Sequence, residues 1–244
     1  MNENNKPKLS IIVPVHNEAE NIHALVYEIH HSISSWSTFE LIIVNDCSSD
    51  NTLMVLQNLR QKWTCLRVLS HSTNKGQSTA ICSGIQSAKY PTIVTLDGDG
   101  QNNPADIIKL YHNYIKYNPA CTMVVGYRKK RNDTFLRRFS SRIANDIRGK
   151  LLGDHCPDTG CGLKLFPRQL FLSFPQFNHY HRFFPALAKR AGATIINVEV
   201  DHRPRTRGQS HYGVFNRLGV GMIDLLGVMW LIRRPCQPEI ESGN

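Results

Sequence analysis

Short apolar runs alternate with amphipathic stretches over the first half of the chain. The apolar runs are rich in β-branched residues and are bounded by polar or glycine-containing segments, which is typical of buried strands. They span residues 9–15, 39–44, 66–70, 90–96 and 121–126. Between these runs, helical spacing of apolar residues predicts helices over 19–33, 52–62, 78–88 and 104–117. Strands and helices that alternate in this way predict an α/β fold, with a mainly parallel central sheet flanked by helices.

The second half of the chain has a different pattern. Two further strands are predicted over 163–166 and 194–200, and a basic amphipathic stretch covers 136–152. This stretch suits either a surface helix packed on the core or a helix that lies in a membrane interface. Residues 218–232 are mostly apolar and are followed by two arginines and a proline, but they are too short to span a bilayer comfortably. They fit either a buried core helix or a helix on a membrane surface, with Trp230 at the level of the lipid headgroups.

Polar clusters follow three of the predicted strands, in residues 14–18, 45–50 and 97–99. In parallel sheets, ligands bind at the carboxyl ends of the strands. Asp97 and Asp99 are separated by one glycine, and two carboxylates this close repel each other unless a cation lies between them. Mg²⁺ or Mn²⁺ would bind both carboxylates and would keep coordination positions open for substrate phosphates. The alternative interpretation of this segment is a simple polar turn after a strand.

A nucleotide fits this arrangement, with the first two loops at the base and ribose and the metal at the diphosphate. No GxGxxG follows the first strand and no GxxxxGK[ST] occurs, which argues against a dinucleotide oxidoreductase and a P-loop enzyme.

The 244 residues suffice for one large α/β domain, and the formal net charge is +10. The basic residues concentrate in 128–150 and 203–207, which fits phosphorylated substrates, anionic lipid or nucleic acid, with a solvated basic surface as the alternative. The N-terminus lacks the apolar core of a signal peptide, and the seven cysteines form no CxxC pair, so a cytoplasmic chain is expected.

In combination, these segments resemble the family 2 glycosyltransferases, in particular the branch of dolichol-phosphate mannose synthase and bacterial polyprenyl-phosphate glycosyltransferases. Seven segments in the family's order carry the resemblance over residues 8–215: 10–18, 43–50, 74–76, 97–101, 125–128, 158–166 and 205–210. The resemblance implies a GT-A type fold and an inverting, metal-dependent transfer from a GDP- or UDP-linked sugar. It also implies a polyprenyl phosphate, undecaprenyl or dolichyl, as the acceptor.

The resemblance also assigns roles to individual residues. The nucleotide sugar would be bound by Pro14, Asn17, Glu18, Asp46, Lys75 and Asp97. The divalent cation, Mg²⁺ or Mn²⁺, would be held by Asp97, Asp99 and Gln101. The acceptor phosphate would be bound by Arg205, Arg207 and Ser210. The catalytic residues would be Asp99, Arg128, Asp158 and Arg205.

The chemistry of the acceptor decides whether a base is needed. A lipid phosphate is already anionic near neutral pH, because the second pKa of phosphate esters is about 6. It needs cations to hold it and no strong base, and the arginine-rich loop at 203–207 favours this case. A saccharide or glycolipid hydroxyl would instead need a general base, for which Asp158 is the candidate.

We therefore expect a catalytic domain over 8–215 and a C-terminal apolar helix over 216–235. The chain would lie peripherally on the inner face of the cytoplasmic membrane, in contact with anionic lipid, with or without an integral membrane partner. A basic protein that binds nucleotide or nucleic acid is the alternative of another class. The sequence lacks RNA-binding motifs with interleaved aromatic residues, so we expect no nucleic-acid partner.

Overall fold

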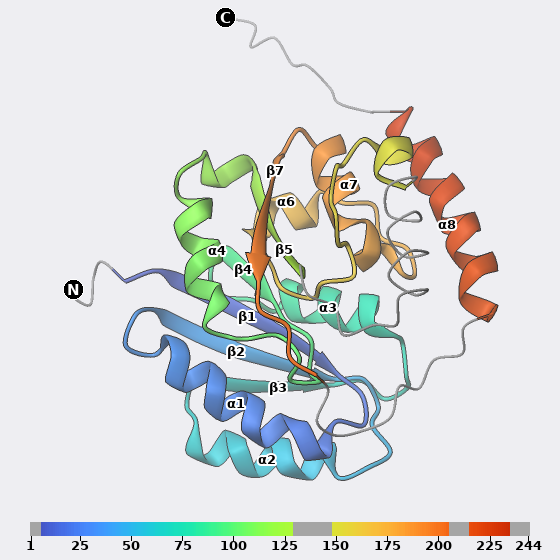
Figure 1. The fold of residues 1–244 in the computed structure, drawn as a ribbon. Helices are drawn as coiled ribbons and strands as arrows, with labels where there is room; N and C mark the ends of the chain where they lie inside the picture. The colour runs from blue at the N-terminus through green and yellow to red at the C-terminus, as the bar shows by residue number, and fades with distance from the viewer. Residues whose placement is uncertain (1–5, 129–147, 205–214, 235–244) are drawn as a thin grey trace, which may run out of the picture.

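The computed structural model describes residues 6–128, 148–204 and 215–234, with the backbone alone over 215–220. Seven strands form one sheet: β1 (Lys8–Val15), β2 (Thr38–Asn45), β3 (Leu66–Ser70), β4 (Thr92–Thr95), β5 (Thr122–Arg128), β6 (Lys164–Pro167) and β7 (Thr194–Val200). The helices are α1 (Ala19–Ile33), α2 (Thr52–Lys62), α3 (Gln77–Gln86), α4 (Asp106–Tyr114), α6 (Arg168–Leu172), α7 (Phe184–Arg190) and α8 (Phe215–Ile232), with 3₁₀ turns η2 (Pro119–Cys121) and η3 (Tyr180–Phe183). The α/β class with a mainly parallel sheet is therefore confirmed (Figure 1).

The strand order is β3-β2-β1-β4-β6-β5-β7. Only β6 runs against its neighbours, since it pairs antiparallel with both β4 and β5. The chain first builds outward from β1 to β3 and then returns to place β4 on the other side of β1. Such a reversal of strand order leaves a crevice at the carboxyl ends of the two strands, here β1 and β4.

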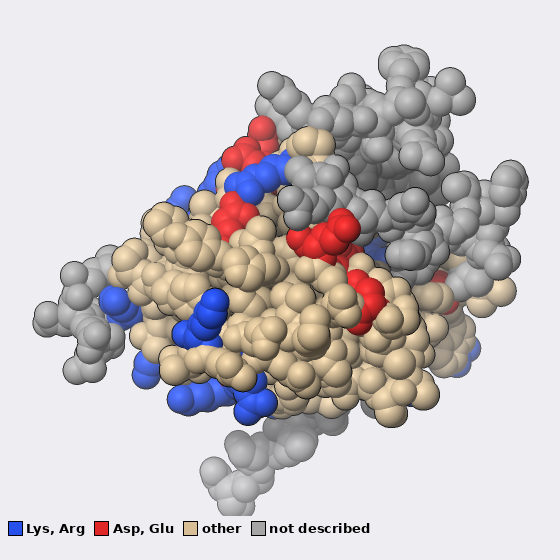
Figure 2. Space-filling view, turned by 90° about the horizontal axis from the view of Figure 1, so that it is seen from below, with Lys and Arg blue, Asp and Glu red and all other residues tan. Residues whose placement is uncertain are grey.

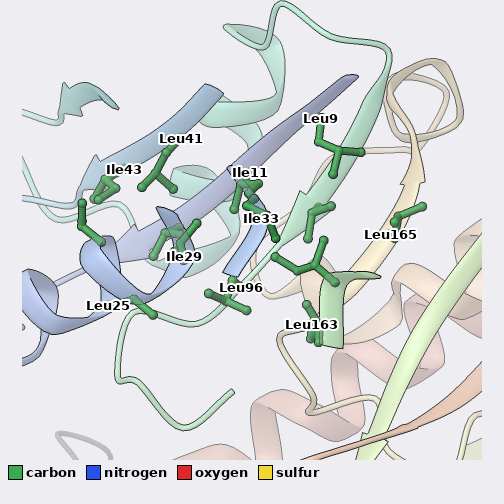
Figure 3. Close-up of a cluster of buried hydrophobic side chains, with 14 of the residues drawn as sticks. Leu9, Ile11, Leu25, Ile29, Ile33, Leu41, Ile43, Leu96, Leu163 and Leu165 are labelled. Atoms are coloured by element: carbon green, nitrogen blue, oxygen red, sulfur yellow. The ribbon is translucent and has the colours of Figure 1, made fainter. Parts of the chain in front are cut away.

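Alternating side chains on the strands divide the core into two layers. Leu9, Ile11 and Val13 of β1 face α1, α2 and α4, and Figure 3 shows part of this cluster. Ile12 faces the opposite side, where α3, α6, α7 and α8 pack. Helices α1 and α2 lie side by side along one face of the sheet, whereas α7 and α8 are together on the other (Figure 1). Successive residues of a strand are buried in opposite layers. A slip by one residue would exchange the two sets of side chains, so this pattern fixes the register of the strands.

The later part of the chain contains two short helices that the sequence did not predict. Helices α6 and α7 were not predicted, because their residues lie among buried aromatic rings and show no amphipathic period. Phe171 of α6 and Phe184 of α7 pack edge to face with ring centroids 5.4 Å apart. Of the predicted helix over 136–152, residues 129–147 lie outside the described part, and residues 148–152 are helical.

The C-terminal helix α8 has one buried side and one exposed side. One side packs on the core through Leu225, Val228 and Met229, while the other side is exposed. Among the described helices, none has both the length and the apolar character needed to cross a bilayer.

Candidate functional site

The loops after β1 and β2 are joined by hydrogen bonds between their backbones and side chains. Asn17 has a positive φ of 56°, and its side-chain oxygen accepts a hydrogen bond of 2.8 Å from the backbone N–H of Ser49. The backbone N–H of Asn17 donates to Ser48 Oγ at 2.9 Å, and that of Glu18 donates to Thr52 Oγ1 at 2.9 Å. Two predicted nucleotide-binding residues, Asn17 and Glu18, thus shape the rim of the crevice.

Asp46, at the end of β2, is buried and fully engaged with the turn that leads into α3. Its two carboxylate oxygens accept hydrogen bonds from the backbone N–H groups of Lys75 at 2.9 Å and Gly76 at 2.7 Å. His71 Nδ1 lies 2.7 Å from Asp46 Oδ1, and the other ring nitrogen lies 2.9 Å from Ser83 Oγ. Gly76 has a φ of 83°, which glycine adopts without steric cost. The predicted residue Lys75 therefore meets Asp46 through its backbone, while its side chain is exposed.

Asp97 follows β4, and its carboxyl group is contacted from two other segments of the chain. Gln77, the first residue of α3, donates its amide N–H to Asp97 Oδ1 at 3.0 Å. Gly162 lies against the same carboxyl group so closely that a Cβ there would overlap it. Burial and, second, the nearby charge of Asp99 raise the pKa of Asp97 to about 6, although Lys164, Arg128 and the Gln77 hydrogen bond oppose this.

Asp99 and Gln101 lie on the next turn. Asp99 Oδ1 accepts a hydrogen bond of 3.1 Å from the backbone N–H of Gln101, which closes the turn. The Gln101 side chain donates to the carbonyl of Arg203 at 3.4 Å, and the backbone N–H of Arg203 donates back to the carbonyl of Gln101 at 3.0 Å. The segment after β7 is thereby fixed beside the Asp97–Asp99 turn.

The donor set around Asp97 and Asp99 fits a hard divalent cation. Two carboxylates that repel each other supply the oxygen ligands that Mg²⁺ and Mn²⁺ prefer. Within the described residues, no cluster of three or more His, Cys, Asp or Glu side chains could form a closed metal cage. A site with only one or two protein carboxylates suits an ion that binds substrate phosphates at its remaining positions.

Two cations border this site on the side of β5 and β6. Arg128, the last residue of β5, forms a two-pronged ion pair with Asp158, with Nε and Nη2 at 2.6 and 2.9 Å from its oxygens. Burial opposes the charge on Arg128, but Asp158 outweighs it, so the pKa of Arg128 is raised. Lys164 of β6 is 4% exposed, and its ammonium group donates to the carbonyls of Cys161 and Thr159.

The structure brings together most of the residues that the sequence singled out. Pro14, at the end of β1, lies against the Asp97–Asp99 turn, since a Cβ on Gly98 would be 3.0 Å from its carbonyl oxygen. Arg205, Arg207 and Ser210 lie outside the described residues, as does most of the basic stretch over 128–150. On the face shown in Figure 2, the described Lys and Arg side chains form scattered groups and no continuous basic surface.

Sequence reasoning missed four residues of the site, namely His71, Gln77, Gly162 and Lys164. Gln77 directly follows the recognised segment 74–76 and is the first residue of α3. Its position next to this segment could have identified it as a candidate site residue. Gly162 and Lys164 lie within the recognised segment 158–166, but nothing in that segment indicates their contact with Asp97. His71 lies in none of the recognised segments, and it reaches the site through its contact with Asp46.

Comparison with known proteins identifies the family. The family model described as "Glycosyl transferase family 2" matches residues 10–173. A dodecaprenyl-phosphate galacturonate synthase of Rhizobium johnstonii is 33% identical over 242 residues, covering 97% of this chain and 71% of the relative. An undecaprenyl-phosphate 4-deoxy-4-formamido-L-arabinose transferase of Aeromonas hydrophila is 29% identical over 232 residues, covering 94% and 70%. The chain thus spans about seven tenths of the length of these relatives.

Solved structures agree on the fold. Mannosyl-3-phosphoglycerate synthase from Rubrobacter xylanophilus superposes with a TM-score of 0.70 at 13% identity, covering 98% of this chain and 78% of that one. A mannosyltransferase from Pyrobaculum calidifontis, solved with GDP-Man and Mn²⁺, gives a TM-score of 0.69 at 18% identity, covering 96% and 66%. These likenesses confirm the GT-A type fold, and the family match over two thirds of the chain shows that it belongs to glycosyltransferase family 2 and is a glycosyltransferase.

Proposed function

We propose that this glycosyltransferase moves a sugar from a nucleotide-diphosphate sugar to a polyprenyl phosphate, with inversion at the anomeric carbon. The observation that carries the proposal is the crevice where Asp97 and Asp99 lie beside two cations, the buried Lys164 and the half-buried Arg128. The relatives from Rhizobium johnstonii and Aeromonas hydrophila, both named for a polyprenyl phosphate, support the choice of acceptor.

On the donor side, Asp97 and Asp99 would hold a divalent cation, with Gln101 on the same turn. When bound, such an ion neutralises the charge that develops on a diphosphate leaving group. Pro14, Asn17 and Glu18 would contact the nucleoside from the rim of the crevice. Asp46 would act on the nucleotide site indirectly, because its carboxylate accepts the hydrogen bonds that hold the turn at Lys75 and Gly76.

On the acceptor side, the Arg128–Asp158 ion pair distinguishes two kinds of chemistry. A hydroxyl acceptor must lose a proton, and Asp158 is the candidate base. Both Asp158 oxygens, however, already accept hydrogen bonds from the Arg128 guanidinium, so abstracting a proton would first break a partly buried ion pair. A phosphate acceptor avoids this step, because its oxygen is already anionic.

The proposed step is therefore a direct displacement. A phosphate oxygen of the lipid attacks the anomeric carbon, and the bond from that carbon to the donor diphosphate breaks, so the electron pair leaves with the nucleoside diphosphate. No proton needs to move. Arg205, Arg207 and Ser210, which lie outside the described residues, would hold the acceptor phosphate.

The lipid acceptor requires contact with a membrane, and the outer face of α8 suits this. Met222, Ile223, Leu226 and Trp230 lie on that face and are 58–72% exposed. The exposed Arg233 and Arg234 follow, and the Arg234 guanidinium lies 5.6 Å from the centre of the Trp230 ring. Apolar residues flanked by arginine and tryptophan are typical of helices that lie in the interface of an anionic membrane. We propose a peripheral position on the inner face of the cytoplasmic membrane, with or without an integral partner, in cell-envelope synthesis.

The test is a transfer assay with the whole chain and vesicles that contain undecaprenyl phosphate. Labelled UDP- and GDP-linked sugars are supplied in turn with Mn²⁺, and label in the lipid phase is measured. We expect one donor to label the lipid, and we expect Asp99→Asn to lose at least about 100-fold of this activity, the scale seen when one group that stabilises transition-state charge is removed.

Two controls define the acceptor. Vesicles with undecaprenol, which has a hydroxyl in place of the phosphate, should remain unlabelled. Transfer to undecaprenol or to a saccharide, with no labelling of the phosphate, would contradict the proposal and favour a hydroxyl acceptor.

A further inference from the structure

The turn before α3 connects the end of β2 to the metal-type carboxylate at the end of β4. Asp46 fixes the backbone of Lys75 and Gly76, and the positive φ of Gly76 then turns the chain into α3. Gln77 is the next residue, and its position is set by this anchored turn. Its side chain reaches Asp97 at 3.0 Å, a hydrogen bond between residues 20 apart in sequence.

Asp97 is held from two sides. The Gln77 amide N–H approaches Oδ1, and the backbone at Gly162 lies directly against the carboxyl group. An additional contact, the hydrogen bond from Thr95 Oγ1 to the carbonyl of Gly162 at 2.7 Å, holds this backbone beside β4. The backbone at Gly162 restricts where the carboxylate can lie. Gln77 is thus the only described side chain with a hydrogen bond to Asp97 in this structure, and it selects which oxygen faces away from α3.

The alternative is that Gln77 merely satisfies a polar contact at the start of a helix. Two observations argue against so passive a role. The donor is placed by a hydrogen-bond network of the buried Asp46 with the half-buried His71 and Ser83. The hydrogen bond from Gln77 also reaches only Oδ1 of Asp97, so it leaves Oδ2 available to a cation.

We propose that Gln77 is a positioning residue of the metal centre, which orients the Asp97 carboxylate so that one oxygen stays directed to the cation. This inference rests on the proposed function, since it presupposes that Asp97 and Asp99 bind a divalent ion. Residues that hydrogen-bond to metal ligands typically account for a factor of 10 to 100 in metal affinity. The geometry points to such a residue outside every motif that sequence reasoning recognised.

The experiment measures binding of Mn²⁺ alone to the full chain, through the electron paramagnetic resonance signal of the free ion. Gln77→Met keeps the length of the side chain and removes the donor. Gln86→Met is the matched control, because it makes the same change at the exposed last residue of the same helix. The melting temperature without metal is recorded for each protein, and Gln77→Ala serves as a second variant should Gln77→Met fold poorly.

We expect wild type and Gln86→Met to bind Mn²⁺ equally, and Gln77→Met and Gln77→Ala to bind it on the order of 10-fold more weakly. Their melting temperatures without metal should stay close to that of wild type. Equal Mn²⁺ affinity in the Gln77 variants and wild type would overturn the inference while leaving the proposed function intact. Absence of Mn²⁺ binding by wild type itself would overturn the metal site and the inference together.

Discussion

Asp97 shows how a single residue acquires its properties from the fold. Its neighbour Asp99 is two positions away in the sequence, but Gln77, Gly162 and Lys164 reach it from three other segments. Burial and Asp99 raise its pKa, whereas Lys164 and Arg128 act in the opposite sense. A divalent cation would reverse the effect of Asp99, because it turns repulsion between the two carboxylates into shared coordination.

Gly162 provides a prediction at this scale. In Gly162→Ala the new methyl group would overlap the Asp97 carboxyl group, so either the carboxylate or the backbone of this segment must shift. Overpacking of this kind costs about 1–3 kcal/mol of folding stability. We expect transfer activity to fall by at least about 100-fold, since the carboxylate leaves its position at the cation.

The matched control is Gly160→Ala, two residues away. There the nearest atom to a new Cβ would be Arg128 Nη2 at 3.4 Å, an ordinary contact. Activity and melting temperature are measured for both variants. Wild-type activity in Gly162→Ala, or an equal loss in Gly160→Ala, would show that close packing on Asp97 does not matter.

Individual site residues were predictable where the signal is local. Asp97 and Asp99 stand out because two carboxylates at the end of an apolar run are unusual, and Arg128 and Asp158 were found through motifs. Asp158 was expected as a candidate base, and the pairing of Arg128 with Asp158 across 30 residues could not be read from either motif alone. Lys164 was missed because a lysine in a short apolar run gives no hint that its ammonium group is buried beside a carboxylate.

At the scale of elements, the amphipathic pattern predicted those helices that present one apolar side to the sheet. Helices α1 and α2 have the bounds that the sequence indicated, because each presents one apolar side to the sheet. Helices α6 and α7 were missed, since an aromatic cluster surrounds them and removes the period. Likewise, the four residues of β6 do not indicate that this strand runs antiparallel to β4 and β5. The direction of a strand relative to its neighbours is set by the connections between strands and not by the strand's own residues.

Helix α8 gives a prediction about membrane contact. Ile223 is 72% exposed on the outer face of the helix, and burying an isoleucine in an apolar environment contributes about 1.5–3 kcal/mol. If this face enters a membrane interface, Ile223→Glu should weaken binding to anionic vesicles by at least about 10-fold. Co-sedimentation of the protein with vesicles of phosphatidylglycerol measures the change.

The control for this helix is Ile115→Glu, at the end of α4 on the opposite face of the sheet, where the isoleucine is 52% exposed. This variant should bind vesicles like wild type. Equal binding by Ile223→Glu and wild type would exclude the outer face of α8 as the membrane contact. An equal loss in both variants would mean that general surface charge, and not this face, governs binding.

The whole molecule places the site where the strand order reverses, between β1 and β4. That position follows from the α/β alternation, so the location of the crevice was predictable once three polar strand ends had been recognised. Which nucleotide it accepts was not predictable, because the base is recognised by loop geometry, which the sequence pattern does not specify. The rim formed by the loops after β1 and β2 is cross-linked through Asn17, and such a preorganised rim should discriminate between bases.

Ligand-dependent stability therefore tests the site as a unit. A ligand that binds only the folded state at 100 times its dissociation constant stabilises it by about 2.7 kcal/mol. For a chain of this size, each 1 kcal/mol raises the melting temperature by about 2–4 °C, so the expected shift is about 5–10 °C. We expect this shift with Mn²⁺ and either GDP or UDP but not with both equally, and we expect EDTA to abolish it.

Differential scanning fluorimetry of wild type and Asp99→Asn makes the comparison. A shift that survives EDTA, or that persists in Asp99→Asn, would mean that the nucleotide binds without the carboxylate pair, and the role of β4 in binding the diphosphate would have to be abandoned.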